Sequence, residues 1–177
     1  MVEEELEAVG SDAGEEPLVD ILMATYNGVR YLGEQISSIL GQSYSHWRLL
    51  VNDDGSSDET VDIVKSYAEK DDRIHLLSLE NKRHDAAGNF LALLGASSAP
   101  YVMFCDQDDV WLSEKVRLEL QAMRELEQEC GADLPLLVFT DSAVVDENLN
   151  VLSPSFAATV PFHPSSITLS RLMVENV

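Results

Sequence analysis

The feature that most constrains the fold is a regular alternation of short apolar runs with longer amphipathic segments, beginning at residue 18. The apolar runs are typical of buried strands, and the amphipathic segments repeat apolar side chains at helical spacing. Strands are expected at 18–26, 47–52, 74–79, 101–105 and 134–141, and helices at 29–40, 86–96, 113–129 and 165–177. A further helix is expected to open at Ser56, which faces Glu59 in a capping-box arrangement. Repeated strand–helix–strand units predict an α/β fold with a mostly parallel, Rossmann-like sheet in three layers.

The chain is strongly acidic, with 32 Asp and Glu against 11 Lys and Arg and a net charge of -21. Residues 1–17 hold seven of the acids and no Lys or Arg, so this segment is expected to be a mobile acidic tail. Residues 18–177 are expected to form the folded part. Its remaining acid excess argues against a nucleic-acid partner, because phosphate contacts need clustered cations. The excess fits either solvation in salt or local sites for a divalent metal.

The two cysteines, Cys105 and Cys130, lack CxxC spacing, which favours a reducing compartment and gives no support for a disulfide between them. No run approaches 18 apolar residues, and the first residues are acidic rather than basic and apolar. Neither a membrane span nor a secretory signal is therefore expected, and the predicted location is cytoplasmic.

Polar side chains gather where the first, second and fourth expected strands end. The three stretches are "ATYNG" (24–28), "NDDGSSD" (52–58) and "CDQDDVW" (105–111). In a parallel sheet, ligands bind outside the carboxyl ends of the strands. The sequence therefore predicts that the three stretches share one edge of the sheet and form one site.

The third stretch is a candidate metal site. In an extended segment, residues i and i+2 point the same way, so Asp106 and Asp108 could present oxygens to one ion. Mg²⁺ and Mn²⁺ take hard oxygen ligands, often one or two carboxylates completed by substrate phosphates. The alternative is that these acids form a turn and a helix N-terminus, a role that suits Asp109 best.

The other two stretches are candidates for binding a nucleoside. Asp53 and Asp54 could accept hydrogen bonds from a base or from ribose hydroxyls. A tight turn followed by a helix cap is the alternative, and it is favoured for Ser56 and Asp58. Tyr26 offers a flat face for a base, and the Asn27–Gly28 turn lets backbone approach closely, although ordinary packing would explain Tyr26 equally well.

Together, "DILMATYNG", "LLVNDDGSSDETVDIV" and "YVMFCDQDDVW" resemble the family 2 inverting glycosyltransferases of the GT-A fold. The later "FTDSAVVDENLNVL" and the "DQDDVW" variant are most similar to bacterial rhamnosyltransferase-type members. The resemblance runs from about residue 19 to the end. It implies metal-dependent transfer, with Mg²⁺ or Mn²⁺, from a nucleoside-diphospho-sugar such as dTDP-rhamnose to an acceptor hydroxyl in surface polysaccharide synthesis. A glycan or lipid-linked acceptor would bring the protein to the inner face of the membrane.

The resemblance also implies roles for individual residues. Asp54 would contact the base with Asp53 beside it, Asp106 would face the ribose or sugar, and Asp108 would bind the metal together with Asp106. The base pocket would be lined by the region that contains Ala24, Tyr26 and Asn27.

Two departures from the family pattern affect the donor loop and the catalytic base. Of the family's N-x-G-x-x-x-N stretch, only Asn89 remains as a donor-binding candidate, because Arg83 and Asp85 replace the first Asn and the Gly. The family's base lies well downstream of the fifth strand, beyond Val177, and Asp141 is a weak candidate for it. The chain is therefore interpreted as the donor-binding half of a longer enzyme.

Two other classes of protein use similar elements. Phosphoryl-transfer domains place an acid after the first strand, but here that strand ends in "ATYNG", which contains none. A non-catalytic module that binds a nucleotide or a protein on the same scaffold is the remaining alternative.

Overall fold

The computed structural model describes residues 16–80, 85–131 and 133–159. Internal contacts divide the chain into two compact units, Met1–Leu120 and Gln121–Val177. Each unit is described by itself. None of the helices in the described ranges combines the length and the apolar character that crossing a bilayer requires.

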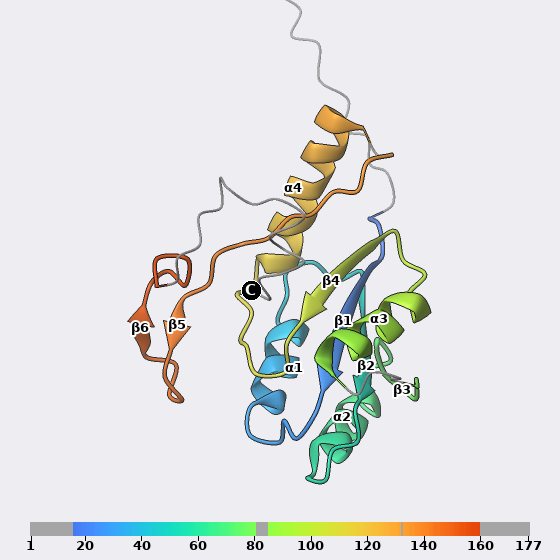
Figure 1. The fold of residues 1–177 in the computed structure, drawn as a ribbon, viewed down its shortest axis with the longest axis vertical. Coiled ribbons are helices and arrows are strands. Elements are labelled where there is room, and N and C mark those ends of the chain that lie inside the picture. The colour runs from blue at the N-terminus through green and yellow to red at the C-terminus, as the bar shows by residue number, and fades with distance from the viewer. Residues whose placement is uncertain (1–15, 81–84, 132, 160–177) are drawn as a thin grey trace, which may run out of the picture. The chain divides into compact units, whose positions relative to one another are not determined.

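The first unit is built on a four-stranded parallel sheet (Figure 1). Its strands are β1 (Val19–Thr25), β2 (Trp47–Asp53), β3 (Ile74–Leu77) and β4 (Tyr101–Cys105), in the spatial order β3-β2-β1-β4. The helices α1 (Leu32–Leu40), α2 (Thr60–Ala68) and α3 (Ala86–Ala96) connect them, and α4 (Lys115–Cys130) follows β4. The predicted parallel α/β fold is therefore confirmed.

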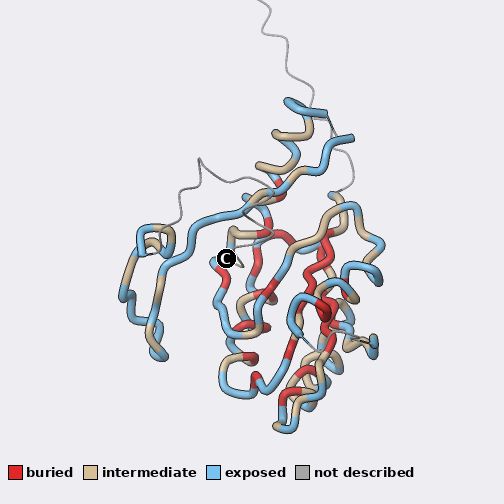
Figure 2. Tube along the Cα trace, viewed as in Figure 1, coloured by how far each residue is buried: buried red, intermediate tan, exposed pale blue. Residues whose placement is uncertain are grey.

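Alternate side chains of the central strands enter two separate apolar cores. Ile21 and Met23 of β1 join a cluster that includes side chains of α1, α2 and the start of α4, whereas Leu22 joins one that includes Leu93 of α3. Helices therefore pack on both faces of the sheet, which gives the three layers that were expected. Figure 2 shows that the buried positions concentrate along the central strands.

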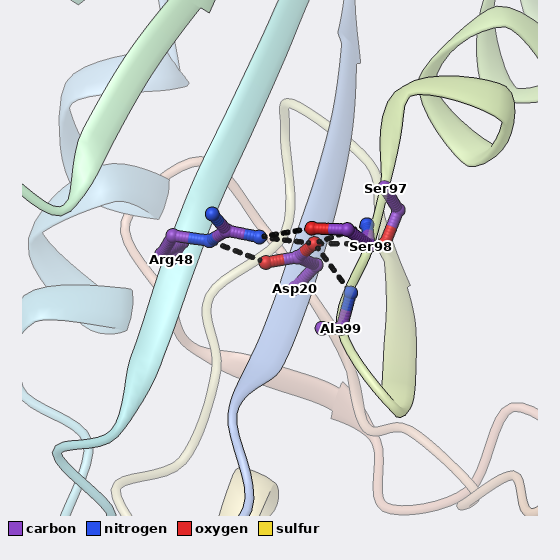
Figure 3. Close-up of polar contacts among 5 residues, drawn as sticks. All are labelled: Asp20, Arg48, Ser97, Ser98 and Ala99. Atoms are coloured by element: carbon purple, nitrogen blue, oxygen red, sulfur yellow. Dashed lines mark hydrogen bonds and ion pairs between the residues drawn. The ribbon is translucent and has the colours of Figure 1, made fainter.

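A buried charged group joins the strands near their amino ends. Asp20, on β1, is fully buried, and its carboxylate accepts hydrogen bonds from Arg48 Nε at 2.8 Å and Arg48 Nη2 at 2.9 Å (Figure 3). Ser97 Oγ also donates to it at 2.7 Å, and the amides of Ser98 and Ala99 lie at 3.4 and 3.3 Å. Burial acts to raise the pKa of Asp20, but the hydrogen bonds from Arg48 and Ser97 and the charge of Arg48 outweigh it and lower the pKa. Asp20 thus links β1 to β2 and to the loop before β4.

The second unit contains the end of α4 and a short antiparallel hairpin of β5 (Val144–Val145) and β6 (Val151–Ser153). The carboxylate of Asp146 accepts hydrogen bonds from the amides of Asn148 and Asn150, each at 2.9 Å. Residues 146–150 form the turn between these two strands, and these contacts explain why its acid is needed there.

The predicted strand at 134–141 is wrong, because no strand is present at these positions. Leu134, Leu137 and Phe139 are all exposed. An apolar run becomes a strand only where another strand completes its hydrogen bonds, and local sequence does not specify that partner. The predicted helix at 165–177 and all but the end of the acidic tail lie outside the described residues.

Candidate functional site

The three polar stretches lie at one edge of the sheet, as predicted. β1, β2 and β4 are adjacent and parallel, and they end at Thr25, Asp53 and Cys105. The register pairs Thr25 with Asp53 and Met23 with Cys105. The loops that follow these strands therefore leave the sheet side by side. We call the surface formed by these three loops the rim.

The first two loops of the rim are tied together by Asn27. This residue has a left-handed backbone with φ 48°, its amide donates to Ser56 Oγ at 2.8 Å, and its side-chain oxygen accepts from Ser57 N at 2.9 Å. The amide of Gly28 donates to Thr60 Oγ1 at 2.8 Å. The side chain of Asn27 thus fixes the shape of the first loop. Tyr26, the residue before it, is 58% exposed at the rim.

The two adjacent acids after β2 differ in their surroundings. The carboxylate of Asp53 accepts hydrogen bonds from the hydroxyls of Thr25 and Ser56 and from the amides of Gly55 and Ser56. These bonds fold the turn, in which Gly55 has φ 87°. Asp54 is half-buried, and its amide donates to the Thr25 carbonyl at 2.9 Å. The turn explains Asp53, and contact of Asp54 with a ligand stays a prediction.

The predicted capping box at Ser56 and Glu59 is wrong. α2 begins at Thr60, and its N-cap, Glu59, makes no side-chain capping bond. Ser56 is instead engaged by Asp53 and by the Asn27 amide. A local contact with Asp53 and a long-range contact with Asn27 therefore replace the capping pattern at Ser56.

The third loop begins directly after Cys105, as expected, but it turns at once. β4 ends at Cys105 and residues 107 and 108 form a turn, so the extended i, i+2 geometry predicted for Asp106 and Asp108 is wrong. The charges of the three nearby acids, Asp106, Asp108 and Asp109, still act on one another. The side chain of Asp106 reaches solvent at the surface, but surrounding protein crowds it, and this desolvation together with the charges of Asp109 and Asp108 raises its pKa. Asp106, Asp108 and Asp109 thus form a cluster of like charge.

Asp109 lies beside Asp108 and precedes α4, which begins at Lys115. Desolvation and the charge of Asp108 raise its pKa, and the charge of Lys115 partly offsets this. Backbone hydrogen bonds to a carboxylate would lower its pKa instead. The raised pKa therefore gives no support to the alternative role of Asp109 as a capping acid.

The acids at the rim suit a metal that arrives with a phosphate ligand. Within the described ranges, no group of three or more His, Cys, Asp and Glu side chains is placed to hold a metal ion. Mg²⁺ is usually held by one or two carboxylates, with water and substrate phosphates completing its shell. Asp106 and Asp108 fit that donor set, and a cation there would relieve the repulsion within the cluster.

Gln107, which no sequence pattern singles out, connects the third loop to the first. Its side-chain oxygen accepts from Tyr26 N at 3.0 Å, and its side-chain nitrogen donates to Tyr26 O at 3.0 Å. These partners are 81 residues apart in the chain, so only the folded topology reveals the contact.

Two of the predicted donor-binding residues lie beneath the rim. Asn89 is 1% exposed, its Oδ1 accepts from Asn52 Nδ2 at 2.9 Å, and its Nδ2 donates to Asn52 O at 2.8 Å. This pairing fixes α3 to the end of β2. Ala24 is half-buried and lies beside Asn52 in the strand register. Contact of either residue with a donor stays a prediction.

Asp141, the weak candidate for the catalytic base, belongs to the second unit. A hydrogen bond from Ser155, with others from the amides of Ala157 and Ser142, lowers its pKa. A lowered pKa makes a carboxylate a weaker acceptor of the proton that a base must remove. These contacts suit a structural or orienting role better.

The chain is similar in sequence to curated glycosyltransferases. It is 39% identical over 106 residues to Escherichia coli WfgD, UDP-Glc:alpha-D-GlcNAc-diphosphoundecaprenol beta-1,3-glucosyltransferase; the match covers 60% of this chain and 41% of WfgD. The chain spans less than half the length of the curated relatives it matches.

Solved structures share the fold. Staphylococcus aureus TarS 1–349 in complex with UDP matches with a TM-score of 0.54 at 23% identity, over 77% of this chain and 45% of TarS. The Pyrobaculum calidifontis mannosyltransferase PcManGT, in complex with GDP-Man and Mn²⁺, matches with a TM-score of 0.52 at 24% identity. The match covers 59% of this chain and 31% of PcManGT. These likenesses show the GT-A fold. The model of the family described as "Glycosyl transferase family 2" matches residues 20–133, well over half of the sequence, and the chain therefore belongs to glycosyl transferase family 2.

Proposed function

We propose that the rim binds a nucleoside-diphospho-sugar with Mg²⁺ or Mn²⁺, and that the whole protein transfers the sugar to an acceptor hydroxyl in polysaccharide synthesis. The observation that carries this proposal is the meeting of three loops at one sheet edge, where the backbone of the exposed Tyr26 is hydrogen-bonded to the loop that carries the acids. Membership of glycosyl transferase family 2 supports it. So do the ligands named for proteins of the same fold, UDP for TarS and GDP-Man with Mn²⁺ for PcManGT.

Each exposed group of the rim has a role that its chemistry allows. The ring of Tyr26 provides a stacking face for the base, and Asp54 accepts hydrogen bonds from the base or the ribose. Asp106 faces the ribose and sugar side, and Asp108 together with Asp106 holds the metal. Asp53 and Asn27 act through the loops that they shape. A metal bound here would neutralise the diphosphate, which is the leaving group of the transfer.

The acceptor side of the reaction needs a base within hydrogen-bond reach of the attacking hydroxyl. None is assigned among the described residues, and Asp141 is proposed to orient the acceptor or the sugar. The similarity to WfgD, whose name states a diphosphoundecaprenol-linked acceptor, supports a lipid-linked acceptor and action at the inner face of the membrane. For the donor, the proposed candidate is dTDP-rhamnose, on the resemblance of the "DQDDVW" stretch.

Calorimetric titration of the purified protein with UDP, GDP and dTDP tests the binding step. We expect one of them to bind in the presence of Mn²⁺, and chelation of the metal with EDTA to weaken that binding by about 10–100-fold, the effect of losing a charge-assisted contact. Failure of all three nucleotides to bind, or binding that EDTA leaves unchanged, would contradict the proposal.

A second titration identifies the donor. With Mn²⁺ present, dTDP-rhamnose should bind more tightly than UDP-glucose if the rhamnosyl assignment holds, and the reverse order would replace that assignment with a glucosyl one. Binding without any transfer by the whole protein would favour the alternative of a non-catalytic nucleotide-binding module.

A further inference from the structure

The side chain of Gln107 bridges the two ends of the proposed donor site. It lies between Asp106 and Asp108 in the sequence, yet its amide group makes two hydrogen bonds, both of 3.0 Å, to the backbone of Tyr26. β1 and β4 pair as strands only as far as Met23 and Cys105. The amide of Gln107 therefore continues the connection between them beyond the last strand pair, and it does so at the rim itself.

Gly28 makes room for this bridge. A Cβ atom at position 28 would lie 2.3 Å from Gln107 Oε1, far inside van der Waals contact. The glycines with positive φ in the described residues are Gly55 and Gly131, so the backbone at Gly28 would accept alanine. The lack of a side chain at this position is therefore explained by the space that the Gln107 amide occupies.

The bridge joins groups with different tasks. On one side, Tyr26 is 58% exposed, and its backbone NH and CO are both hydrogen-bonded to Gln107. On the other side, the turn at 107–108 carries the acids proposed to hold the metal. A nucleoside diphosphate would touch both, with its base at the first loop and its diphosphate at the second.

On the basis of the proposed function, we propose that Gln107 is a positioning residue that fixes the metal-binding turn to the base-binding loop, so that metal and nucleotide bind cooperatively. The bridge sets the distance between the two loops before the ligands bind. A metal bound at the acids can therefore raise the affinity for the nucleotide without any cost of ordering the loops. Without the bridge, the loops must be ordered on binding, and part of that coupling is lost. Coupling is reciprocal, so either ligand can be used to measure it.

The test uses Gln107→Met, which keeps the length and the charge of the side chain but removes both hydrogen bonds. The probe is the nucleoside diphosphate among UDP, GDP and dTDP that binds the unaltered protein most tightly with Mn²⁺. The measured quantity is the ratio of its dissociation constants in EDTA and in Mn²⁺. We expect the ratio to fall by about fivefold or more, a typical coupling between sites, while the dissociation constant in EDTA changes little. Gln121→Met, at an exposed residue of α4, is the matched control and should leave the ratio unchanged.

Gly28→Ala perturbs the same hydrogen bonds from the loop that contains Tyr26. The added methyl group should push the flexible end of Gln107 away and lower the same ratio without altering any polar side chain. In a double-mutant cycle, Gly28→Ala should then have little further effect in a Gln107→Ala protein, because the group that it displaces is already gone. Fully additive effects of the two substitutions would contradict the proposed mechanism.

The outcomes separate this inference from the proposed function. If the unaltered protein binds none of the three nucleotides with Mn²⁺, both fail. If it binds and Gln107→Met keeps the same ratio, the inference alone is overturned. A purely structural role would lower the urea midpoint of Gln107→Met and leave the ratio unchanged, which also overturns it.

Discussion

Replacing Arg48 with methionine should lower the free energy of unfolding of the first unit by about 3 kcal/mol. The substitution keeps most of the apolar length of the side chain but leaves the fully buried carboxylate of Asp20 without its cation. Removing one partner of a buried ion pair costs roughly 3–5 kcal/mol, and the 33% exposure of the Arg48 side chain places the expected loss at the lower end. Urea unfolding followed by tryptophan fluorescence measures it, because Trp47 and Trp111 are both buried in this unit.

Arg117→Met is the matched control for this substitution. Arg117 pairs with Glu114 at 2.5 Å, but the two side chains are 47% and 44% exposed. Exposed ion pairs contribute roughly 0–1 kcal/mol, so the same chemical change should move the urea midpoint little. Equal losses for the two variants would show that the burial of Asp20 does not determine the energy of its pair.

The loss caused by Arg48→Met should also depend on pH. In the unaltered protein the pKa of Asp20 is lowered, so the pair contributes its full stability above the unfolded pKa of about 3.9 and loses it as the pH falls further. In the variant, burial acts without the charge of Arg48 and raises the pKa, so protonation relieves the penalty as the pH falls toward about 4. The difference in stability between the two proteins should therefore shrink on acidification from pH 7. A difference that grows would contradict this account.

The secondary structure was predictable where it depends on nearby residues. α3 and β4 begin and end where periodicity placed them, at Ala86–Ala96 and Tyr101–Cys105. Residues 134–141 have an equally apolar pattern and form no strand, because a strand depends on a neighbour that local sequence does not encode. Asp20 was missed for the same reason: it is an acid inside an apolar run, and only its contact with Arg48, 28 residues away, explains it.

The location of the candidate site was predictable, but the division of tasks among its residues was not. Parallel topology alone places the ends of β1, β2 and β4 at one edge. The sequence could not show that Asp53 folds its own turn, or that Gln107 reaches Tyr26, because hydrogen bonds of the folded chain decide both. Strand order therefore predicts where a site forms more readily than it predicts which neighbouring acid meets the ligand.

Replacing Asp108 with asparagine should remove most of the metal-dependent nucleotide binding and leave the fold intact. Loss of a residue that merely orients a metal ligand typically weakens metal affinity by about 10–100-fold, so loss of a direct ligand should cost at least as much. Titration of the tightest-binding nucleoside diphosphate in Mn²⁺ measures the effect. Asp72→Asn, an exposed aspartate between α2 and β3, makes the same change at the opposite edge of the sheet and should bind as the unaltered protein does.

Although Asp108→Asn should weaken nucleotide binding, it should not lower the stability of the fold. The charge of Asp108 contributes to the raised pKa of both Asp106 and Asp109, so the cluster opposes folding when no cation is present. Removing one charge relieves that repulsion, and the urea midpoint in EDTA should stay the same or rise. Weaker binding together with unreduced stability separates a ligand-binding acid from a structural one, because an acid that holds a turn or a helix start would lose stability on the same substitution. If Asp108→Asn instead destabilises the fold and binds the nucleotide normally, the crowded acids serve the loop, and the metal site must lie elsewhere.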